Sequence, residues 1–258
     1  STYDSVLSLP FNIPFYGDHV SLFALLMTVA LFAFSYINYQ QTASSQPQMA
    51  GMKFMMVYLM PVMMLLWFNS YSSGLTYYYF LANILTIGQT LVIRRMIDEG
   101  HTVAIHGYSH DYAAIYKSDE AFMQNIYRLR DRLRSDFGYE AAIIRFPGGS
   151  SNTVSRQYSV GIMSRLAQRV QAEGFTYFDW NVSSGDAAGT PASSGQIYNN
   201  VTSALRHDRS NVVLMHDTGA KGTTADALPD IIRYCLANGY SIQPITPATK
   251  PVHHGIAN

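Results

Sequence analysis

The chain has 258 residues, no formal net charge and 48% hydrophobic residues, values that would suit an ordinary globular protein. The charges are unevenly spread, because residues 1–93 carry only Asp4, Asp18 and Lys53. No basic tail or block of like charge occurs, so nucleic acid is excluded as a partner, and the single Cys235 excludes an internal disulfide. The step in composition predicts two domains, residues 1–93 and 94–258.

The first domain contains three apolar runs without charge. Residues 9–18, before the first run, are rich in proline and aromatic residues and are expected to be irregular. The runs predict three transmembrane helices in a lipid bilayer, at about residues 20–38, 54–68 and 75–93. Pro61 suits a membrane helix better than a soluble one. Core helices of a soluble protein are the alternative, but those need a polar face, which these runs lack.

Basic residues set the predicted orientation of these helices. Lys53 follows the first run, and Arg94 and Arg95 follow the third. Because basic residues are enriched in cytoplasmic loops, residues after 93 are predicted on the cytoplasmic side of the membrane.

Three stretches carry a family resemblance. LPFNIPFYGDHVSLF, QMAGMKFMMVYLMPVMM and FNSYSSGLTYYYFLANILTIGQ together resemble the carboxy-terminal half of a YidC-type membrane protein insertase, over about residues 7–99. The resemblance implies the bacterial inner (cytoplasmic) membrane and a groove that receives hydrophobic segments of new proteins, without a cofactor. The family's groove arginine has no counterpart, since no basic residue lies within the three runs. A fragment without insertase activity is therefore expected.

After residue 93 the pattern changes to alternating strands and amphipathic helices. We predict strands at residues 101–106, 141–146, 175–182, 211–216 and 240–246, and helices at 118–137, 160–173, 196–206 and 223–237. The second domain is therefore predicted to be an α/β domain with a mostly parallel sheet or barrel.

Four polar side chains fall at the carboxyl ends of these strands. They are His106, Arg145, Asp186 and His216. Catalytic groups of parallel barrels gather at this end of the strands, so the four predict a site. His110 lies one helical turn from His106, and two imidazoles at that spacing can reach one divalent metal ion, although pairs of surface histidines show the same spacing.

Other polar residues have competing interpretations. The segment Arg145-Phe-Pro-Gly-Gly149 is either a simple turn or a guanidinium that orients a carboxylate beside oxyanion-binding N–H groups. Asp179 is an alternative to Asp186, but it falls inside the predicted strand 175–182. His253 and His254 are expected to be exposed and without a role.

The motifs HGYSHD, RFPGG, DWNVSSGDA and VVLMHD, in this order, resemble a polysaccharide deacetylase of the NodB-homology type, also called carbohydrate esterase family 4, over about residues 94–258. The resemblance implies metal-dependent hydrolysis of N-acetyl groups on a glycan such as peptidoglycan or chitin. It also implies that His106 and His110 bind the metal, zinc or a similar divalent ion.

The resemblance assigns roles to five further residues. His216 would protonate the departing amine with support from Asp186, and Arg145 would hold the catalytic base. Gly148 would present its amide to the oxyanion, and Leu214 would line the pocket for the acetyl methyl group. Gly107 departs from the family, which usually has Ser or Thr there, and Ala187 stands where Trp is common.

The resemblance also exposes a gap. The family takes its catalytic base and an anionic metal ligand from an early strand with the pattern Thr-Phe-Asp-Asp-Gly-Pro, and no such segment occurs, so no catalytic base is found. We therefore expect weakened metal binding, no activity, and an incomplete (β/α)7-type barrel that lacks its first two strands. Unpaired strand edges would favour aggregation or pairing with another chain.

The segment Arg94-Arg-Met-Ile-Asp-Glu99 suits both resemblances. It can follow the last insertase span, and it can be the barrel helix before residue 101. The sequence thus indicates a join of two unrelated genes at a shared short segment, with a purposeful fusion as the alternative. A deacetylase, an insertase fragment and a join without activity remain the three functional hypotheses, and the glycan, the metal and the oligomeric state stay open.

Overall fold

A computed structural model gives the fold, and it describes residues 2–14, 16–43, 54–69, 71, 73–187, 191–219 and 221–258. The chain divides into two compact units, Ser1–Glu99 and Gly100–Asn258. Lys53, on which the orientation prediction partly depends, lies outside the described residues.

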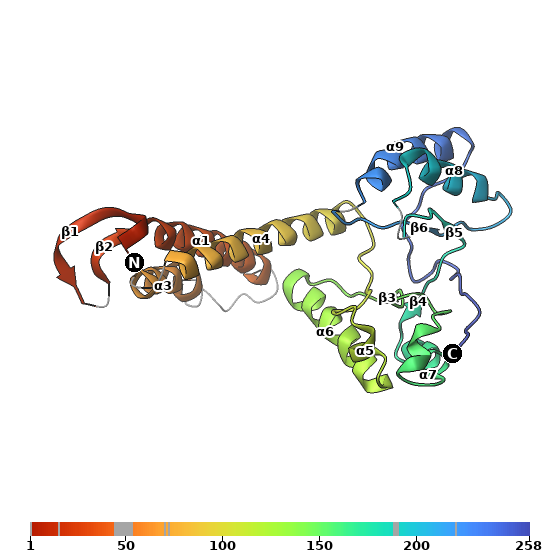
Figure 1. Cartoon of the computed structure of the whole chain (residues 1–258), viewed down its shortest axis with the longest axis horizontal. Helices are drawn as coiled ribbons and strands as arrows, with labels where there is room; N and C mark the ends of the chain where they lie inside the picture. The colour runs from red at the N-terminus through yellow and green to blue at the C-terminus, as the bar shows by residue number, and fades with distance from the viewer. Residues whose placement is uncertain are drawn as a thin grey trace. The chain divides into compact units, whose positions relative to one another are not determined.

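A hairpin precedes the helices of the first unit (Figure 1). The elements are η1 (Thr2–Asp4), β1 (Ser5–Ile13), β2 (Gly17–Ser21), α1 (Leu22–Ala43), the π-helical η2 (Phe54–Leu59), α3 (Met60–Phe68) and α4 (Ser73–Asp98). The expectation of irregular structure at residues 9–18 is wrong, because β1 and β2 pair antiparallel up to Ile13 and Gly17. Gly17 has φ 103, a conformation that favours glycine and allows the tight turn.

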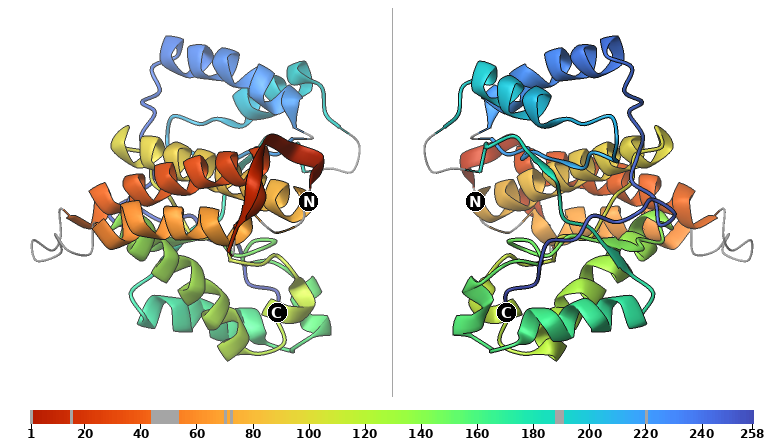
Figure 2. Two further views of the ribbon diagram at one scale, coloured as in Figure 1. Left: turned by 90° about the vertical axis from the view of Figure 1, so that its left-hand side faces the viewer. Right: turned by 90° about the vertical axis from the view of Figure 1, so that its right-hand side faces the viewer.

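All three apolar runs are helical, as predicted. α1 packs against α3 and α4, and the helices run side by side (Figure 2). Pro61 lies in the first turn of α3, directly after η2, and its fixed φ suits this helical position. α4 extends beyond the predicted run to Asp98, and Gly100, with φ 83, follows its end.

One helix among the described residues, α4, is long and apolar enough to cross a bilayer, and its most apolar stretch has no buried residue. The apolar parts of the other two, Leu22–Ile37 and Phe54–Phe68, are shorter. The count of three transmembrane helices therefore stays a prediction.

The second unit alternates helices with short parallel strand pairs. Its elements are α5 (Tyr112–Ile115), α6 (Asp119–Phe137), β3 (Ile143–Ile144), η3 (Val154–Gln157), α7 (Ile162–Ala172), β4 (Thr176–Tyr177), β5 (Val182–Ser183), α8 (Ser194–Ala204), β6 (Val213–Leu214) and α9 (Gly222–Ala237). The four helices predicted here are confirmed as α6 to α9. In α6, the Ser118 side chain accepts from the Ala121 amide at 3.2 Å, and Gly138 ends the helix at φ 63.

The strands are shorter than predicted. β3 pairs with β4 and β5 with β6, so the single strand expected over residues 175–182 is wrong. Residues 101–106 contribute one parallel bridge, Ile105 to Ile144, and residues 240–246 form no strand. A strand forms only where the backbone N–H and C=O groups of a neighbouring segment pair with its own. Between these two segments the bond comes from a side chain, because the Thr102 hydroxyl donates to the Ile245 carbonyl at 2.5 Å.

Two apolar clusters hold the second unit together. One joins Ile105 and β3 to α6 and α7 through residues such as Phe122, Phe146 and Leu166, all at most 1% exposed. The other joins β5 to α8 and α9 around Ile197. Side chains that follow β3, β5 and β6 are thereby fixed at the ends of short parallel strands.

The final residue caps a helix far away in sequence. Gly161, at the start of α7, offers no capping side chain, and Asn258 Oδ1 accepts from its amide at 2.8 Å. The Asn258 carbonyl accepts from the Ser164 amide at 3.0 Å, and Asn258 Nδ2 donates to Ser155 Oγ at 2.8 Å. Asn258 is 8% exposed.

We expect Asn258→Ala to lower the free energy of unfolding by about 1 to 2 kcal/mol, because the side-chain bonds to the Gly161 amide and the Ser155 hydroxyl are lost, whereas the backbone bond to Ser164 remains. Denaturant unfolding followed by Trp180 fluorescence measures this, with Trp67→Phe making Trp180 the only tryptophan. Gln124→Ala removes an exposed amide from α6 and serves as the control. Equal midpoints for the two variants would contradict a capping role.

Candidate functional site

His106 is placed by the bridge between Ile105 and Ile144. The Arg145 amide donates to the Ile105 carbonyl at 2.9 Å, which sets His106 beside Arg145. His106 Nδ1 lies 2.8 Å from the Arg145 carbonyl oxygen. A carbonyl can only accept, so Nδ1 carries the proton and Nε2 keeps its lone pair, the form that binds metals.

The surroundings of His106 disfavour its protonation. Burial lowers its pKa to about 4 against the opposing effect of the Arg145 carbonyl, and the charges of Arg145, His110 and His216 lower it further. These four side chains therefore lie close enough to interact electrostatically. The structure brings together four of the predicted site residues, which come from three of the sequence motifs.

His110 is held beside His106 by a short loop. The ring centroids of the two imidazoles are 5.2 Å apart, and that of His110 is 5.3 Å from Tyr112. Asn125 fixes the loop, because its Oδ1 accepts from the Tyr108 amide at 2.6 Å. Gly107 has φ 105, and a Cβ there would lie 2.9 Å from Asn125 Oδ1, so this loop excludes the Ser or Thr common in the resembled family.

The two imidazoles do not make a complete metal site. Catalytic zinc sites use three protein ligands and an open position. No group of three or more His, Cys, Asp or Glu side chains suited to a metal ion occurs among the described residues. The donor set therefore does not fit a catalytic zinc ion.

Arg145 and Gly148 lie on the turn after β3. Burial lowers the pKa of Arg145, while the charge of Asp179 raises it. Gly148 is exposed, with φ 79, and a Cβ there would lie 2.7 Å from the Tyr112 hydroxyl and 3.1 Å from Asn152 Nδ2. The lack of a side chain keeps the Gly148 backbone open toward these two polar groups.

Asp186 and His216 form a direct pair. Asp186 Oδ1 lies 2.8 Å from His216 Nδ1, and its Oδ2 accepts from the His216 amide at 2.7 Å and from the Thr224 hydroxyl at 3.1 Å. Lys221 Nζ donates to the Asp186 carbonyl. Burial alone would raise the pKa of Asp186, but hydrogen bonds from His216, Ser184 and Thr224 outweigh it and lower the pKa to about 2. A carboxylate held ionised in this way keeps the imidazole oriented.

Leu214 lies in β6, opposite Ser183 of β5 and two residues before His216. It is half-buried. The β5–β6 pairing therefore fixes Leu214 at the end of β6, two residues before the Asp186–His216 pair.

Asp179 has a structural environment. It is 1% exposed, and its carboxylate accepts from the Ser150 amide at 2.8 Å, the Ser150 hydroxyl and the His254 amide at 2.8 Å. The placement of Asp179 inside a strand is wrong, because it lies after β4 with its amide bonded to the Val252 carbonyl. Both His253 and His254 were expected to be exposed, and this is right for His253, whose ring stacks on Tyr177 with centroids 3.9 Å apart. It is wrong for His254, which is half-buried with its Nε2 2.6 Å from the Trp180 carbonyl oxygen.

Sequence reasoning missed several neighbours of the site. Tyr112 and Asn152 flank Gly148, and Thr224 and Lys221 contact Asp186. Tyr112 follows the HGYSHD motif directly, and this position was the one available signal for it.

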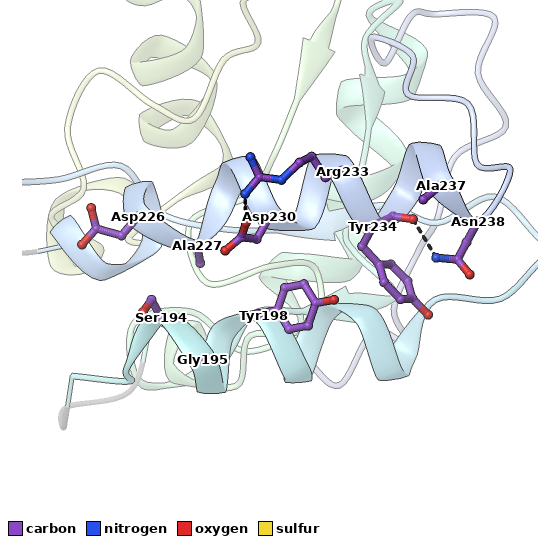
Figure 3. Close-up of a pocket in the computed structure, with 10 residues that line it drawn as sticks. All are labelled: Ser194, Gly195, Tyr198, Asp226, Ala227, Asp230, Arg233, Tyr234, Ala237 and Asn238. Carbon is purple, nitrogen blue, oxygen red and sulfur yellow. Dashed lines mark hydrogen bonds and ion pairs between the residues drawn. The ribbon is translucent and has the colours of Figure 1, made fainter.

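A separate groove of about 570 Å³ lies between α8 and α9 (Figure 3). Tyr198 and Tyr234 face each other across it with ring centroids 6.0 Å apart, and Asp230 pairs with Arg233 along α9. None of the predicted site residues lines this groove.

Comparison with family models gives two matches. Residues 1–100 match the 60Kd inner membrane protein family, and residues 69–162 match the polysaccharide deacetylase family. The two matched ranges overlap over residues 69–100, which contain α4.

The first unit is similar to membrane protein insertases named YidC. The protein of Parabacteroides distasonis is 47% identical over 108 residues, which are 40% of this chain and 17% of that protein. The protein of Bacteroides fragilis is 50% identical over 100 residues, 38% of this chain and 16% of that protein. The chain thus spans about a sixth of the length of these insertases.

Over about two thirds of its length the chain is similar to solved structures of deacetylases. The catalytic domain of peptidoglycan N-acetylglucosamine deacetylase from Eubacterium rectale is 43% identical, with a TM-score of 0.63 over 66% of this chain and 76% of that one. A CE4 esterase of Streptococcus mutans is 27% identical, with a TM-score of 0.51 over 59% of this chain and 66% of that one.

Proposed function

Because the chain belongs to the polysaccharide deacetylase family and carries a YidC-type insertase fragment ahead of that domain, we propose that its second unit is a deacetylase domain for N-acetylated glycans, of the peptidoglycan or chitin-like kind, that is inactive as it stands. Hydrolysis of an N-acetyl amide needs a base to take a proton from water and an acid to protonate the departing amine. The second unit contains the acid and no base.

The Asp186–His216 pair is the observation that carries this proposal. In the complete reaction His216 would protonate the amine nitrogen as the C–N bond breaks, and Asp186 holds the imidazole by its Nδ1, which leaves Nε2 for that proton transfer. Asp186 stays ionised because its pKa is about 2. Both oxygens of this carboxylate are occupied, which supports a fixed orientation for the imidazole.

The remaining residues bind and position the amide. With a base present, the exposed Gly148 amide would donate to the oxygen that becomes negative, and the half-buried Leu214 would contact the acetyl methyl group. Arg145 would orient a carboxylate base that this chain does not supply. His106 and His110 bind a divalent ion such as zinc weakly, since the third protein ligand is missing.

The missing base and ligand belong to a missing part of the fold. In this proposal the second unit is a seven-strand barrel without its first two strands, and residues 101–106 pair on one side only. The short ladders of β3 to β6 are consistent with a sheet that lacks neighbours.

Acetate release tests the proposed function. The purified full chain, with added zinc and an N-acetylglucosamine oligomer, should release no more acetate than buffer does. His216→Ala should give the same trace, because the acid is idle without a base. Sustained release that His216→Ala abolishes would show that another group acts as the base, and the proposal of an inactive domain would fall.

We further propose that the first unit lies in the bacterial inner membrane, with three spans at about residues 20–38, 54–68 and 75–93 and with residues after 93 on the cytoplasmic side. Large apolar side chains on all three helices support this, since Val29, Trp67 and Leu85 are each at least 65% exposed. Such exposure is costly in water and favourable in lipid.

Labelling of single cysteines tests the orientation. Cys235 is the only cysteine, so Cys235→Ser gives a cysteine-free chain, and Ser135→Cys places a thiol on the exposed side of α6. A membrane-impermeant maleimide should label Ser135→Cys in inverted vesicles and not in intact spheroplasts. The opposite pattern would place the second unit outside.

Two alternatives concern the chain as a whole. As an insertase fragment it would restore membrane insertion in cells depleted of their own insertase, although none of the three spans offers a basic residue. As an inert join of two genes it would neither restore membrane insertion nor release acetate. The overlap of both family matches over residues 69–100 supports a join at a shared segment, and long-read sequencing of the source DNA across residues 93–101 tests it.

A further inference from the structure

We infer that the groove between α8 and α9 binds a de-N-acetylated amino-sugar chain through the ammonium groups that such a chain carries. The groove has a volume of about 570 Å³, and none of the predicted site residues lines it. Binding in this groove needs no metal, base or acid, and it rests on the proposed function only for the choice of a glycan.

The groove is long and open. Its lining on α9 runs from Asp226 to Asn238, twelve positions along a helix, which is about 18 Å at 1.5 Å per residue. On α8 the lining includes Gly195, where an added Cβ would meet no neighbouring atom within 4 Å, so that open space lies beside it. Such a length suits a linear chain of several units better than one compact molecule.

Two tyrosines form a corner in the groove, one from each helix (Figure 3). The ring centroids of Tyr198 and Tyr234 are 6.0 Å apart, the ring planes are inclined at 85°, and both residues are half-buried. Neither hydroxyl forms a hydrogen bond with any residue that the structure describes. The two tyrosines therefore offer ring faces that attract an ammonium group and hydroxyls that can bond to sugar hydroxyls.

The charge of the groove is negative. Asp226 and Asp230 line it together with one basic residue, Arg233, and Asp230 already pairs with that guanidinium. Asp226 is exposed and forms no ion pair within the described part of the chain. One carboxylate is therefore left over, and beside two tyrosine rings it favours a cation over an anion or a neutral group.

The lining disfavours a protein segment as the occupant. A helix that docks in a groove needs a row of apolar anchors, whereas polar and charged side chains stand along this groove from Ser194 and Asp226 to Asn238. An extended peptide pairs with free backbone groups at a sheet edge, and helices such as α8 and α9 make these bonds internally. A sugar chain instead uses side-chain donors, side-chain acceptors and ring faces, which this groove supplies.

The groove begins close to the proposed acid along the chain. Asp226 follows Thr224 by two residues, and the Thr224 hydroxyl donates to Asp186 Oδ2 at 3.1 Å. α9 therefore connects one end of the groove to the Asp186–His216 pair. Hydrolysis of an N-acetyl amide leaves acetate and a sugar chain with free amines, and this is the chain that the negative charge of the groove suits.

A ligand-observed NMR titration of the full chain tests this inference, in a detergent without sugar headgroups and after removal of metal by dialysis against a chelator. The probe is a linear tetramer of glucosamine, which should bind with a saturating curve that weakens as sodium chloride is raised. The fully N-acetylated tetramer lacks the ammonium groups and should bind about five-fold more weakly or worse. Tetralysine carries ammonium groups without sugar rings and should also bind about five-fold more weakly or worse.

Two variants assign the binding to the groove without removing a buried side chain. Gly195→Trp fills the open space on α8, and Asp226→Asn removes the unpaired charge, so each should weaken binding of the glucosamine tetramer by about five-fold or more. Asp208→Asn removes an exposed carboxylate outside the groove and is the matched control, with unchanged binding. His216→Ala should also leave the binding unchanged, because the sugar chain does not need the proposed acid.

A non-saturating curve, or equal binding by wild type, Gly195→Trp and Asp226→Asn, would overturn the groove as the site, and so would loss of binding in His216→Ala. Equal affinity for the N-acetylated tetramer would overturn the recognition of ammonium groups. Equal affinity for tetralysine would overturn the choice of a sugar chain. Acetate release by the wild-type chain would contradict the proposed inactivity without changing any of these binding results, so the two proposals can fail separately.

Discussion

Replacing residues 1–93 with a strand–helix–strand segment that carries the Thr-Phe-Asp-Asp-Gly-Pro pattern is expected to give sustained acetate release where the parent chain gives none above buffer, because a positioned general base contributes ~10²- to 10⁴-fold to such a rate. The physical reason is that the parent has a proton donor for the amine and no proton acceptor for water. The segment supplies a carboxylate that Arg145 can hold. Acetate is measured with an N-acetylglucosamine oligomer and zinc.

Two controls make this result specific. The same graft with both aspartates changed to asparagine should fold and release nothing, because an amide is a poor proton acceptor. The graft with His216→Ala should lose release, because the leaving amine then has no acid. Release by the double-asparagine graft would show that the new strands act only by completing the barrel.

Helices could be predicted from the sequence because their signals are local. In α6 the apolar spacing of Phe122, Ile126 and Leu133 predicts the buried face, and the three side chains are at most 4% exposed. Ser118 and Gly138 mark the two ends of α6 as its capping residues. A helix makes its backbone hydrogen bonds within itself, so its sequence suffices.

Strands could not be predicted in the same way, because a strand's hydrogen bonds depend on its neighbour. Residues 240–246 have an apolar, strand-like sequence, yet they form no ladder, and Ile242 is 54% exposed. The hairpin of β1 and β2 was missed for the opposite reason. Pro10 argues against a strand interior, but β1 is an edge strand in a two-stranded sheet, where proline is tolerated.

The candidate site was predictable where a motif fixes both residues locally. His106 and His110 lie together as their spacing indicates. The contacts of Asp186 were not predictable, because Thr224 is 38 residues away and reaches it only through the start of α9. Tyr112 is distinguished from the other tyrosines only by its position directly after the HGYSHD motif, which does not predict its contact with Gly148.

Asp186→Asn is expected to lower the free energy of unfolding at pH 7 by about 2 to 3 kcal/mol, since a buried carboxylate with charge-assisted hydrogen bonds is lost. The Asp186 side chain is 3% exposed and accepts from His216 and Thr224. Denaturant unfolding with Trp180 as reporter measures the change. Asp217→Asn, an exposed neighbour, is the matched control and should have little effect.

The pH dependence separates this carboxylate from a merely well-packed side chain. Its pKa falls from an ordinary 3.8 to about 2 in the folded state. A lowered pKa stabilises the fold above the ordinary value and loses that stabilisation as pH falls toward the folded value, here about 2 kcal/mol lost between roughly pH 4 and pH 2. Other carboxylates titrate in the same range, so the informative quantity is the difference between wild type and Asp186→Asn. That difference should be constant above about pH 5 and shrink below pH 4, whereas a difference that stays constant down to pH 2 would mean that Asp186 acts by shape and not by charge.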